Sequence, residues 1–343
     1  MKVDVGAVEA ELARLQRELT NSEVRTSLFN LVVMSPDAQR AMVDEALNYL
    51  LGKRAARVIH IVTKPDATSS LEISARCFVD REHKGVCFEE IIITNGSDGQ
   101  GGAPGTWIPL LVRDIPTYIL WLDTISDKRG LFSHVQNQAD KIIVDSDQSV
   151  ELGEEPDALL PLLAGVAVSQ GVPLADFSWK RLRPYRRLAA AAFDADDRLG
   201  LVNEIVSVHV RGLRPMAGHL LGLWFAERLG WTRTAAPERE SGDAAGSAGA
   251  AAASDRYRDV RGRPVEVTVE PGEPGCNVAV SLRLASEHTV DIEAGTDGCA
   301  DVEYPGGEEE RTVTIPSNGE ILLEEVDAVY ADDFYRDALA LLK

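Results

Sequence analysis

The chain has 343 residues and a formal net charge of −20, and 45% of its residues are hydrophobic. This length and apolar content are typical of a globular protein with two domains. A protein this acidic is repelled by phosphate backbones and anionic lipids, which argues against nucleic acid and membranes as partners. No apolar run reaches the ~20 residues of a membrane-spanning helix, and the first residues lack the apolar core of a signal peptide, so we expect a cytoplasmic protein.

The first 150 residues predict an α/β domain with a mixed sheet. Apolar residues recur at helical spacing from Val8 to Leu19 and predict an amphipathic helix. Residues 27–34 and 57–62 are strand-like, and the helix predicted between them opens at Pro36. A strand–helix–strand unit of this kind pairs its two strands in parallel.

Two further strand-like runs, residues 71–79 and 86–94, are separated by a short charged turn. They predict a hairpin that is added to the same sheet. The remaining elements predicted for this domain are a helix at residues 106–112, a strand at 118–121, a helix at 131–138 and a strand at 141–144.

Residues 151–343 predict an α+β domain that begins with a helical segment. Residues 234–258 hold a run rich in Ser, Gly and Ala that buries too little apolar surface to offset its ordering entropy, so we predict a flexible insertion. After it, apolar and polar residues alternate between Gly- and Pro-rich turns, which predicts an antiparallel sheet with one solvated face. The predicted helices lie at 159–168, 179–193, 216–229 and 332–342, and the predicted strands at 205–210, 264–270, 278–284, 288–293 and 311–315.

The four cysteines form no CxxC pair and lie at no ligand spacing from a histidine, so the sequence predicts no metal site. Cys77 and Cys87 lie in neighbouring strand-like runs and could face each other across the hairpin. In a cytosolic protein we nevertheless expect all four thiols to be reduced. Cys276 and Cys299, in loop-rich sequence, are the better candidates for redox chemistry.

A glycine-rich segment runs from Gly99 to Gly105, follows a predicted strand and opens a helix. This is the layout of a phosphate-binding turn, although its spacing is not GxGxxG and the next helix is barely two turns long. We predict a surface loop here. The alternative is a nucleotide- or sugar-phosphate-binding site formed by Gly99, Gly101, Gly102 and Gly105.

Motifs of hydrolytic enzymes are missing, since the chain has no GxSxG, HExxH or P-loop sequence. Ser133 and His134 with Asp140 or Asp145 supply the residue types of a catalytic triad, but they are expected to be cap and surface positions. Glu89 and Glu90 are adjacent in a strand, so their carboxylates point to opposite faces and cannot act on one substrate. The sequence therefore predicts neither an enzyme nor a cofactor.

One segment departs from the acidic composition: residues 180–187 hold five cations and no acid, directly after Trp179. Arg, Trp and Tyr are enriched at the centres of protein interfaces and in anion sites. The alternative is an internal clamp, in which the arginines pair with carboxylates between the two domains. We predict a partner-binding surface formed by Asp176, Trp179, Arg181, Arg183, Tyr185 and Arg186.

Short motifs follow one another in a characteristic order between residues 25 and 231. They include Arg25-Thr26, Leu31-Val32-Val33, Arg57-Val58-Ile59, Glu89-Glu90-Ile91, Asp114-Ile115-Pro116, Ile143-Val144-Asp145-Ser146, Asp176-Phe177, Pro184-Tyr185-Arg186 and Arg228-Leu229-Gly230-Trp231. In this order they resemble the OpcA family of glucose-6-phosphate dehydrogenase assembly proteins. Leu120-Trp121 stands where that family has two tryptophans, and Tyr185 stands where it has one.

The resemblance implies a non-catalytic partner of glucose-6-phosphate dehydrogenase. Such a protein promotes the oligomeric assembly of the dehydrogenase or activates it allosterically, at the entry to the oxidative pentose phosphate pathway. Glucose-6-phosphate dehydrogenase is therefore the expected partner, and a phosphate-ligand enzyme or sensor at the glycine-rich segment is the competing hypothesis.

Overall fold

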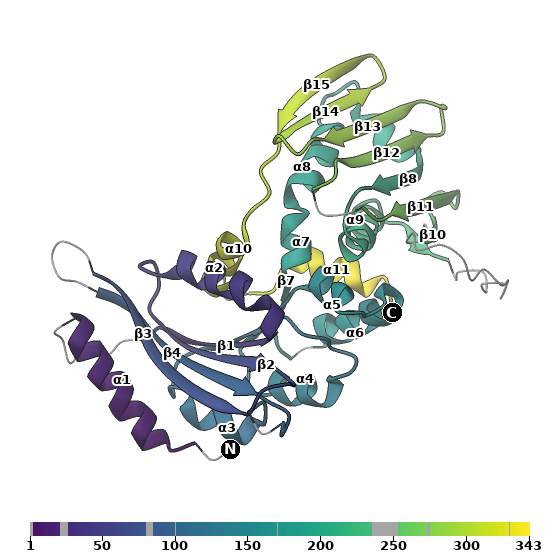
Figure 1. Cartoon of the computed structure of the whole chain (residues 1–343). Coiled ribbons are helices and arrows are strands. Elements are labelled where there is room, and N and C mark those ends of the chain that lie inside the picture. The colour runs from purple at the N-terminus through teal and green to yellow at the C-terminus, as the bar shows by residue number, and fades with distance from the viewer. Residues whose placement is uncertain are drawn as a thin grey trace. The chain divides into compact units, whose positions relative to one another are not determined.

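The computed structural model describes residues 3–20, 27–79, 85–99, 101–169, 171–234, 253–272, 275–328 and 330–343 (Figure 1). The chain forms two compact units, and each is assembled from separate stretches of sequence. Unit 1 comprises Met1–Gly153, Ser169–Phe177 and Ser317–Ala331, and unit 2 comprises Glu154–Val168, Ser178–Pro316 and Asp332–Lys343.

Unit 1 is built on a seven-stranded sheet with the order β3-β4-β2-β1-β5-β6-β7. Strand β3 runs antiparallel to β4, and all the other neighbours are parallel, which confirms both the predicted hairpin and the predicted strand–helix–strand unit. Without β3, the parallel strands have the order of a doubly wound dinucleotide-binding sheet. The strands are β1 (Phe29–Pro36), β2 (Ala56–Thr63), β3 (Ser70–Val79), β4 (Gly85–Asn95), β5 (Thr117–Trp121), β6 (Lys141–Val144) and β7 (Leu174–Asp176).

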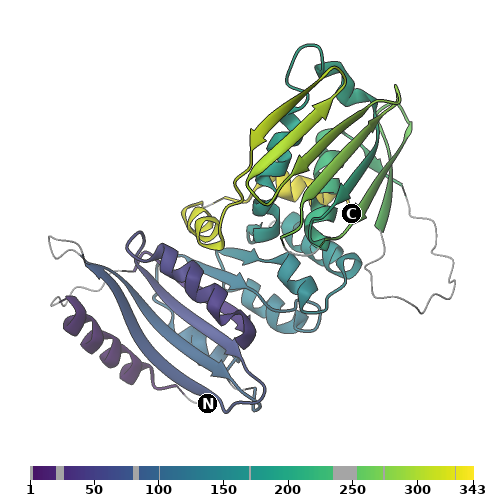
Figure 2. The same cartoon turned by 45° about the horizontal axis from the view of Figure 1, so that its top comes forward.

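Helices cover both faces of this sheet, as its nearly continuous apolar strands require. In Figures 1 and 2, α1 runs alongside β3 and β4, and α2 packs against α10. The helix predicted at residues 106–112 is a single turn followed by a 3-10 turn, because Pro109 cannot continue the helical hydrogen bonds. The helices are α1 (Val5–Thr20), α2 (Arg40–Leu50), α3 (Pro104–Trp107), α4 (Arg129–Gln136), α5 (Ser146–Glu151) and α10 (Asn318–Asp327).

Helix α10 comes from near the end of the sequence and packs in unit 1, where no helix was predicted. Ser317 and Glu320 form a capping box at its start. On its buried face, Glu325 forms an ion pair with Lys141, and the two side chains are 3% and 1% exposed. Lys141 Nζ also donates to the main-chain oxygens of Glu325 and Ala328, at 3.0 Å each. These contacts hold α10 against the first residue of β6.

Unit 2 contains an eight-stranded sheet with the order β15-β14-β13-β12-β8-β11-β10-β9. Its neighbours are antiparallel, as predicted, except that β8 and β11 are parallel. The exception arises because α9 and the β9–β10 pair intervene between these two strands. The strands are β8 (Ile205–Arg211), β9 (Thr232–Arg233), β10 (Ala253–Arg258), β11 (Pro264–Glu270), β12 (Val278–Leu284), β13 (Thr289–Ala294), β14 (Cys299–Tyr304) and β15 (Gly307–Thr312).

Helix α9 packs on β8 and β11 through its glycines. A Cβ at Gly218 would lie 2.3 Å from a Val269 methyl group, and one at Gly222 would lie 2.8 Å from a Val267 methyl group. Glycine is therefore needed for this close approach. The helices are α6 (Pro156–Val168), α7 (Phe177–Arg181), α8 (Arg183–Ala191), α9 (Pro215–Arg228) and α11 (Asp333–Ala340), and a 3-10 helix spans Leu199–Glu204.

The insertion predicted at residues 234–258 lies mostly outside the described residues, which resume at Ala253. From there, Ala253–Arg258 form β10 and pair with β11 over their whole length. The predicted strand at 311–315 is displaced, because β15 ends at Thr312 and lies mostly before it. The Glu-rich sequence of β15 does not show the apolar–polar alternation that identified the other strands.

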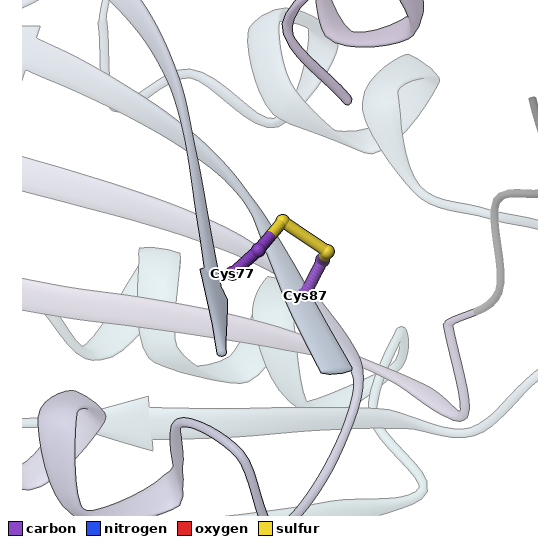
Figure 3. The surroundings of a disulfide bond; sticks show 2 residues. All are labelled: Cys77 and Cys87. Atoms are coloured by element: carbon purple, nitrogen blue, oxygen red, sulfur yellow. A yellow bond between two sulfur atoms is a disulfide. The ribbon is translucent and has the colours of Figure 1, made fainter. Parts of the chain in front are cut away.

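A disulfide joins Cys77 of β3 to Cys87 of β4 (Figure 3). The two residues are directly opposite in the antiparallel register, and their Cα atoms are 4.0 Å apart. The expectation of four reduced thiols is therefore wrong for this pair, because the hairpin register places the two side chains on the same face. Cys276 and Cys299 are free and exposed.

Candidate functional site

Doubly wound sheets bind ligands at the carboxyl ends of their parallel strands, where the strand order reverses. In unit 1 the reversal lies between β1 and β5. The chain segments that follow these two strands are therefore the first place to look for a site. The segment after β1 was not singled out as a site from the sequence.

The turn after β1 carries a carboxylate where a dinucleotide-binding protein has glycines. Residues 27–51 contain no glycine, and β1 ends at Pro36 in an extended conformation. The next residue, Asp37, accepts a hydrogen bond from Lys64 Nζ at 2.8 Å. Without glycines, the side chains at this turn keep the backbone N–H groups away from a pyrophosphate. This turn does not fit a dinucleotide.

The end of β5 is closed by its own hydrogen bonds. Asp123 is 6% exposed and forms an ion pair with Lys128. It also accepts a hydrogen bond from the backbone N–H of Thr124 at 2.8 Å, and its main-chain oxygen accepts from Trp121 Nε1 at 2.9 Å. Its carboxylate therefore holds the chain after β5 in place.

A buried histidine lies between the strands at the same end of the sheet. His60 of β2 is 1% exposed, and its Nε2 lies 2.8 Å from Ser35 Oγ of β1. Burial lowers the pKa of His60 to about 4, and the charges of Arg40 and Arg76 act in the same direction. The imidazole is therefore neutral at physiological pH and packs as part of the sheet.

The predicted glycine-rich site follows β4, two strands away from the reversal. Gly101 and Gly102 lie against Asn95: a Cβ at Gly101 would be 2.7 Å from the Asn95 Cα, and one at Gly102 would be 2.9 Å from its side-chain nitrogen. Gly99 has a φ of 64°, and a Cβ at Gly105 would meet open space. These contacts give two glycines a packing role, and the anion site there stays a prediction.

The acids considered for catalysis hold other residues in place. Glu89 pairs with buried Arg57 at 2.6 Å, and Glu90 pairs with Arg76 at 2.6 Å. Asp140 accepts a hydrogen bond from the backbone N–H of Thr117 at 2.8 Å. Within the described parts of the chain, no group of three or more His, Cys, Asp or Glu side chains is arranged to hold a metal ion.

The six residues predicted to bind a partner are divided between the two units. Asp176 ends β7 in unit 1, is 1% exposed and accepts from the backbone N–H of Ser146 at the start of α5, at 3.1 Å. The other five belong to α7 and α8, which divide the helix predicted at 179–193, and Pro184 lies in the first turn of α8. Asp176 is thus buried rather than part of an exposed surface, and the partner-binding role of the six residues stays a prediction.

Trp179 is fully buried in unit 2 and anchors the basic segment. Its Nε1 donates to Asp332 Oδ2 at 3.1 Å, and its ring packs on Tyr335 with 5.3 Å between centroids. The Arg186 guanidinium lies 3.7 Å from the Trp179 ring centroid, and Lys180 Nζ lies 3.5 Å from Asp332. These contacts fasten α7 and α8 to the start of α11.

Charge is concentrated on this segment. Burial lowers the pKa of Arg186 to about 10, with Arg183 and Arg187 acting in the same direction and Asp332 opposing them. The guanidinium stays charged at neutral pH and stabilises the Trp179 ring contact. Tyr185 is 6% exposed, Arg181 and Arg183 are half-buried, and Arg187 is exposed.

Asp332 is the residue of this cluster that the sequence did not single out. It caps α11 by accepting from the backbone N–H of Tyr335 at 3.2 Å. An aspartate directly before a predicted helix is a recognisable cap signal. Its link to Trp179 spans more than 150 residues and follows only from the tertiary structure.

Two family models match most of the chain. The glucose-6-phosphate dehydrogenase subunit N-terminal domain matches residues 48–161, and the corresponding C-terminal domain matches residues 172–339. No described helix is both long and apolar enough to cross a bilayer.

Curated relatives are candidate OxPP cycle proteins named OpcA. The chain is 29% identical over 205 residues to that of Synechocystis sp., which covers 58% of this chain and 41% of the relative. It is 28% identical over 318 residues to that of Synechococcus elongatus, which covers 86% of this chain and 68% of the relative. A third, from Nostoc punctiforme, is 29% identical, and 39% of its length is covered. The matches thus span about two fifths of the length of two of these relatives.

Among solved structures, a 3-ketoreductase from Actinomadura kijaniata in complex with NADP is similar to this chain. The TM-score is 0.51 at 12% identity, and the match covers 92% of this chain and 95% of the reductase. A likeness at this identity shows the fold alone.

Proposed function

The chain belongs to the glucose-6-phosphate dehydrogenase subunit family, also called the OpcA family, and we propose that it is a non-catalytic partner of glucose-6-phosphate dehydrogenase. It binds the dehydrogenase in the cytoplasm and promotes its oligomeric assembly or its allosteric activation in the oxidative pentose phosphate pathway. The match of both family models in order along the chain carries this proposal.

A non-catalytic role is supported by the turn after β1, where the strand order of unit 1 reverses. A dehydrogenase with this sheet order needs a glycine turn after β1 to hold its dinucleotide. Here Pro36 ends β1, and Asp37, which follows it, is paired with Lys64 directly after β2. The sheet has the strand order of a dinucleotide-binding domain but lacks the glycine turn that would hold the phosphates.

We place the contact with the dehydrogenase on the solvent side of α7 and α8. Trp179 and Tyr185 are buried and fix the two helices, so they act on a partner only through the arginines around them. Arg181 and Arg183 are partly accessible and carry planar guanidinium groups that bind carboxylates in a bidentate manner. An acidic surface on the dehydrogenase is the complement of this segment.

The first experiment mixes the protein with the dehydrogenase of its own organism. An activator binds the active conformation better than the inactive one, and a coupling of ~1–3 kcal/mol raises activity ~5–150-fold at low substrate. The two proteins should also elute together in size-exclusion chromatography. Separate elution with unchanged activity would refute the proposal.

The contact surface is tested with Arg183→Glu, which reverses one charge of the basic segment. We expect ~10-fold weaker binding to the dehydrogenase, as for the loss of one charge-assisted contact. The matched control is Arg129→Glu, an exposed arginine at the start of α4. If Arg183→Glu unfolds the protein, or binds as tightly as the control, the segment is an internal clamp and the contact lies elsewhere.

The alternative function is a nucleotide- or sugar-phosphate-binding enzyme or sensor at Gly99–Gly105. Its support is the position of the loop between a strand and a helix. Thermal shift with nicotinamide cofactors and glucose 6-phosphate discriminates, because a ligand at 100 times its dissociation constant adds ~2.7 kcal/mol. A shift that Gly105→Asp abolishes would favour this alternative over the regulatory role.

A further inference from the structure

A hollow of about 800 Å³ lies in unit 2 at one end of its sheet. Four neighbouring strands, β12, β8, β11 and β10, contribute to its lining, together with the residue that ends the β10–β11 turn. Figure 1 labels these strands side by side. Ligand sites in proteins have volumes of about 300–1,000 Å³, so this hollow has the size of a small-molecule site.

Four arginines line this hollow, against one acid. The chain as a whole has 35 Lys and Arg against 55 Asp and Glu, so the charge here is locally reversed. Glu266 is the single acid of the lining, and the remaining lining residues are Val206, Thr234, Tyr257, Pro264 and Val265. The arginines are Arg256, Arg258, Arg263 and Arg283.

Two of these arginines are fixed in place by the β10–β11 turn. Arg263 Nε donates to Asp259 Oδ2 at 2.7 Å, and its Nη2 donates to the Asn203 main-chain oxygen at 2.5 Å. Arg258 Nη1 donates to the Gly262 main-chain oxygen at 2.9 Å. Each guanidinium has five N–H groups, so both keep donors for a ligand. A side chain that is already ordered loses less entropy when a ligand binds.

The other two arginines stand at the ends of one row across the sheet. Arg283 of β12 is opposite Ser207 of β8, Ser207 is opposite Glu266 of β11, and Glu266 is opposite Arg256 of β10. Three strand spacings separate the outer residues, which gives ~14 Å between their Cα atoms. Arg256 and Arg283 are exposed, and neither has an ion pair with another described residue.

We propose that this hollow binds a phosphorylated small molecule with an anionic group at each end and a sugar between them. Arg256 and Arg283 bind the two ends through bidentate charge-assisted hydrogen bonds. Glu266, midway between them, already accepts from Ser254 Oγ at 2.9 Å and can accept from a sugar hydroxyl in the same way. The Glu266 carboxylate would repel a third phosphate at that position. The ligand class is therefore a sugar with anionic groups at its two ends only.

The neighbouring part of the same sheet, which shares β8 and β12 with this hollow, repels such a ligand. A second hollow, of about 590 Å³, is lined by carboxylates of β13, β14 and β15 and by the single cation Arg211. In this hollow Asp291 is opposite Glu303, and Glu303 is opposite Glu308. An anion approaching unit 2 is therefore directed to the arginine hollow.

The test titrates the full-length protein, without any dehydrogenase, with fructose 1,6-bisphosphate, glucose 6-phosphate and inorganic pyrophosphate by isothermal calorimetry. The bisphosphate should bind with one site per chain and more tightly than the other two probes. The Arg256→Gln/Arg283→Gln variant should bind it at least ~10-fold more weakly, because two charge-assisted contacts are lost. Both side chains are exposed, so the variant should keep the wild-type melting temperature.

Arg129→Gln is the matched control, since it removes an exposed charge at the start of α4, outside the hollow and outside the basic segment. It should leave the affinity unchanged. The proposal is overturned if none of the three probes binds at millimolar concentration. It is also overturned if Arg129→Gln weakens binding as much as the double variant, because binding would then follow net charge alone. Neither result bears on the partnership with the dehydrogenase.

Discussion

Replacing Lys141 by Met should destabilise unit 1 strongly, because Glu325 would then be a buried carboxylate without its cation. Both side chains are at most 3% exposed, and Lys141 Nζ also donates to two main-chain oxygens. Removing one partner of a buried ion pair costs about 3–5 kcal/mol. We therefore expect the free energy of unfolding to fall by that amount in urea titrations.

The double variant Lys141→Met/Glu325→Leu separates the loss of the pair from the burial of an unpaired charge. Replacing a buried ion pair with apolar residues of similar size is often neutral or stabilising. The double variant should therefore recover at least ~2 kcal/mol relative to the single one.

An exposed ion pair of the same helix provides the control. Arg54 pairs with Asp327 at 2.7 Å, and the two side chains are 38% and 40% exposed. Arg54→Met should cost no more than ~1 kcal/mol, because solvent screens such a pair. A loss below ~1 kcal/mol for Lys141→Met, or equal losses for the single and double variants, would show that α10 is not held by this pair.

Two further predictions concern unit 1. Cys77→Ser/Cys87→Ser should lower the free energy of unfolding by about 2–3 kcal/mol, since the disulfide closes a short loop, and denaturation under reducing conditions should give the same loss for the wild type; no effect of either would refute the pairing. His60 has a folded pKa of about 4, below the unfolded value, so the unfolded chain binds its proton first and stability should fall as the pH drops from ~6.5 to ~4. In His60→Gln, the free energy of unfolding from urea titrations should fall across this pH range by on the order of 3 kcal/mol less than in the wild type. An unchanged pH dependence would contradict a buried neutral imidazole.

The sheet of unit 1 was predictable because each parallel strand is a nearly continuous apolar run next to a clear helix signal. The runs at 27–34 and 57–62 fall on β1 and β2, and their parallel pairing follows from the helix between them. Helix α10 was missed although its Ser317–Glu320 capping box is visible in the sequence. Its place in unit 1 depends on Lys141, far away along the chain.

The candidate sites were harder to predict, because they depend on neighbours that are distant in sequence. Trp179 is an interface residue type by composition, but Asp332 and Tyr335 bury it. The arginine hollow was not found because its residues come from four strands and only the sheet order aligns Arg256 with Arg283. Glycine content drew attention to the loop after β4, whereas the strand order directs it to the glycine-free turn after β1.

We propose that this chain binds glucose-6-phosphate dehydrogenase and promotes its assembly or activation without catalysing a reaction itself. The most direct measurement is glucose-6-phosphate dehydrogenase activity at low substrate, assayed for the dehydrogenase alone, for this protein alone and for the mixture after co-elution. We expect no activity for this protein alone, one shared elution peak, and a higher rate in the mixture. Separate peaks with an unchanged rate, or oxidation of glucose 6-phosphate by this protein alone, would contradict the proposal.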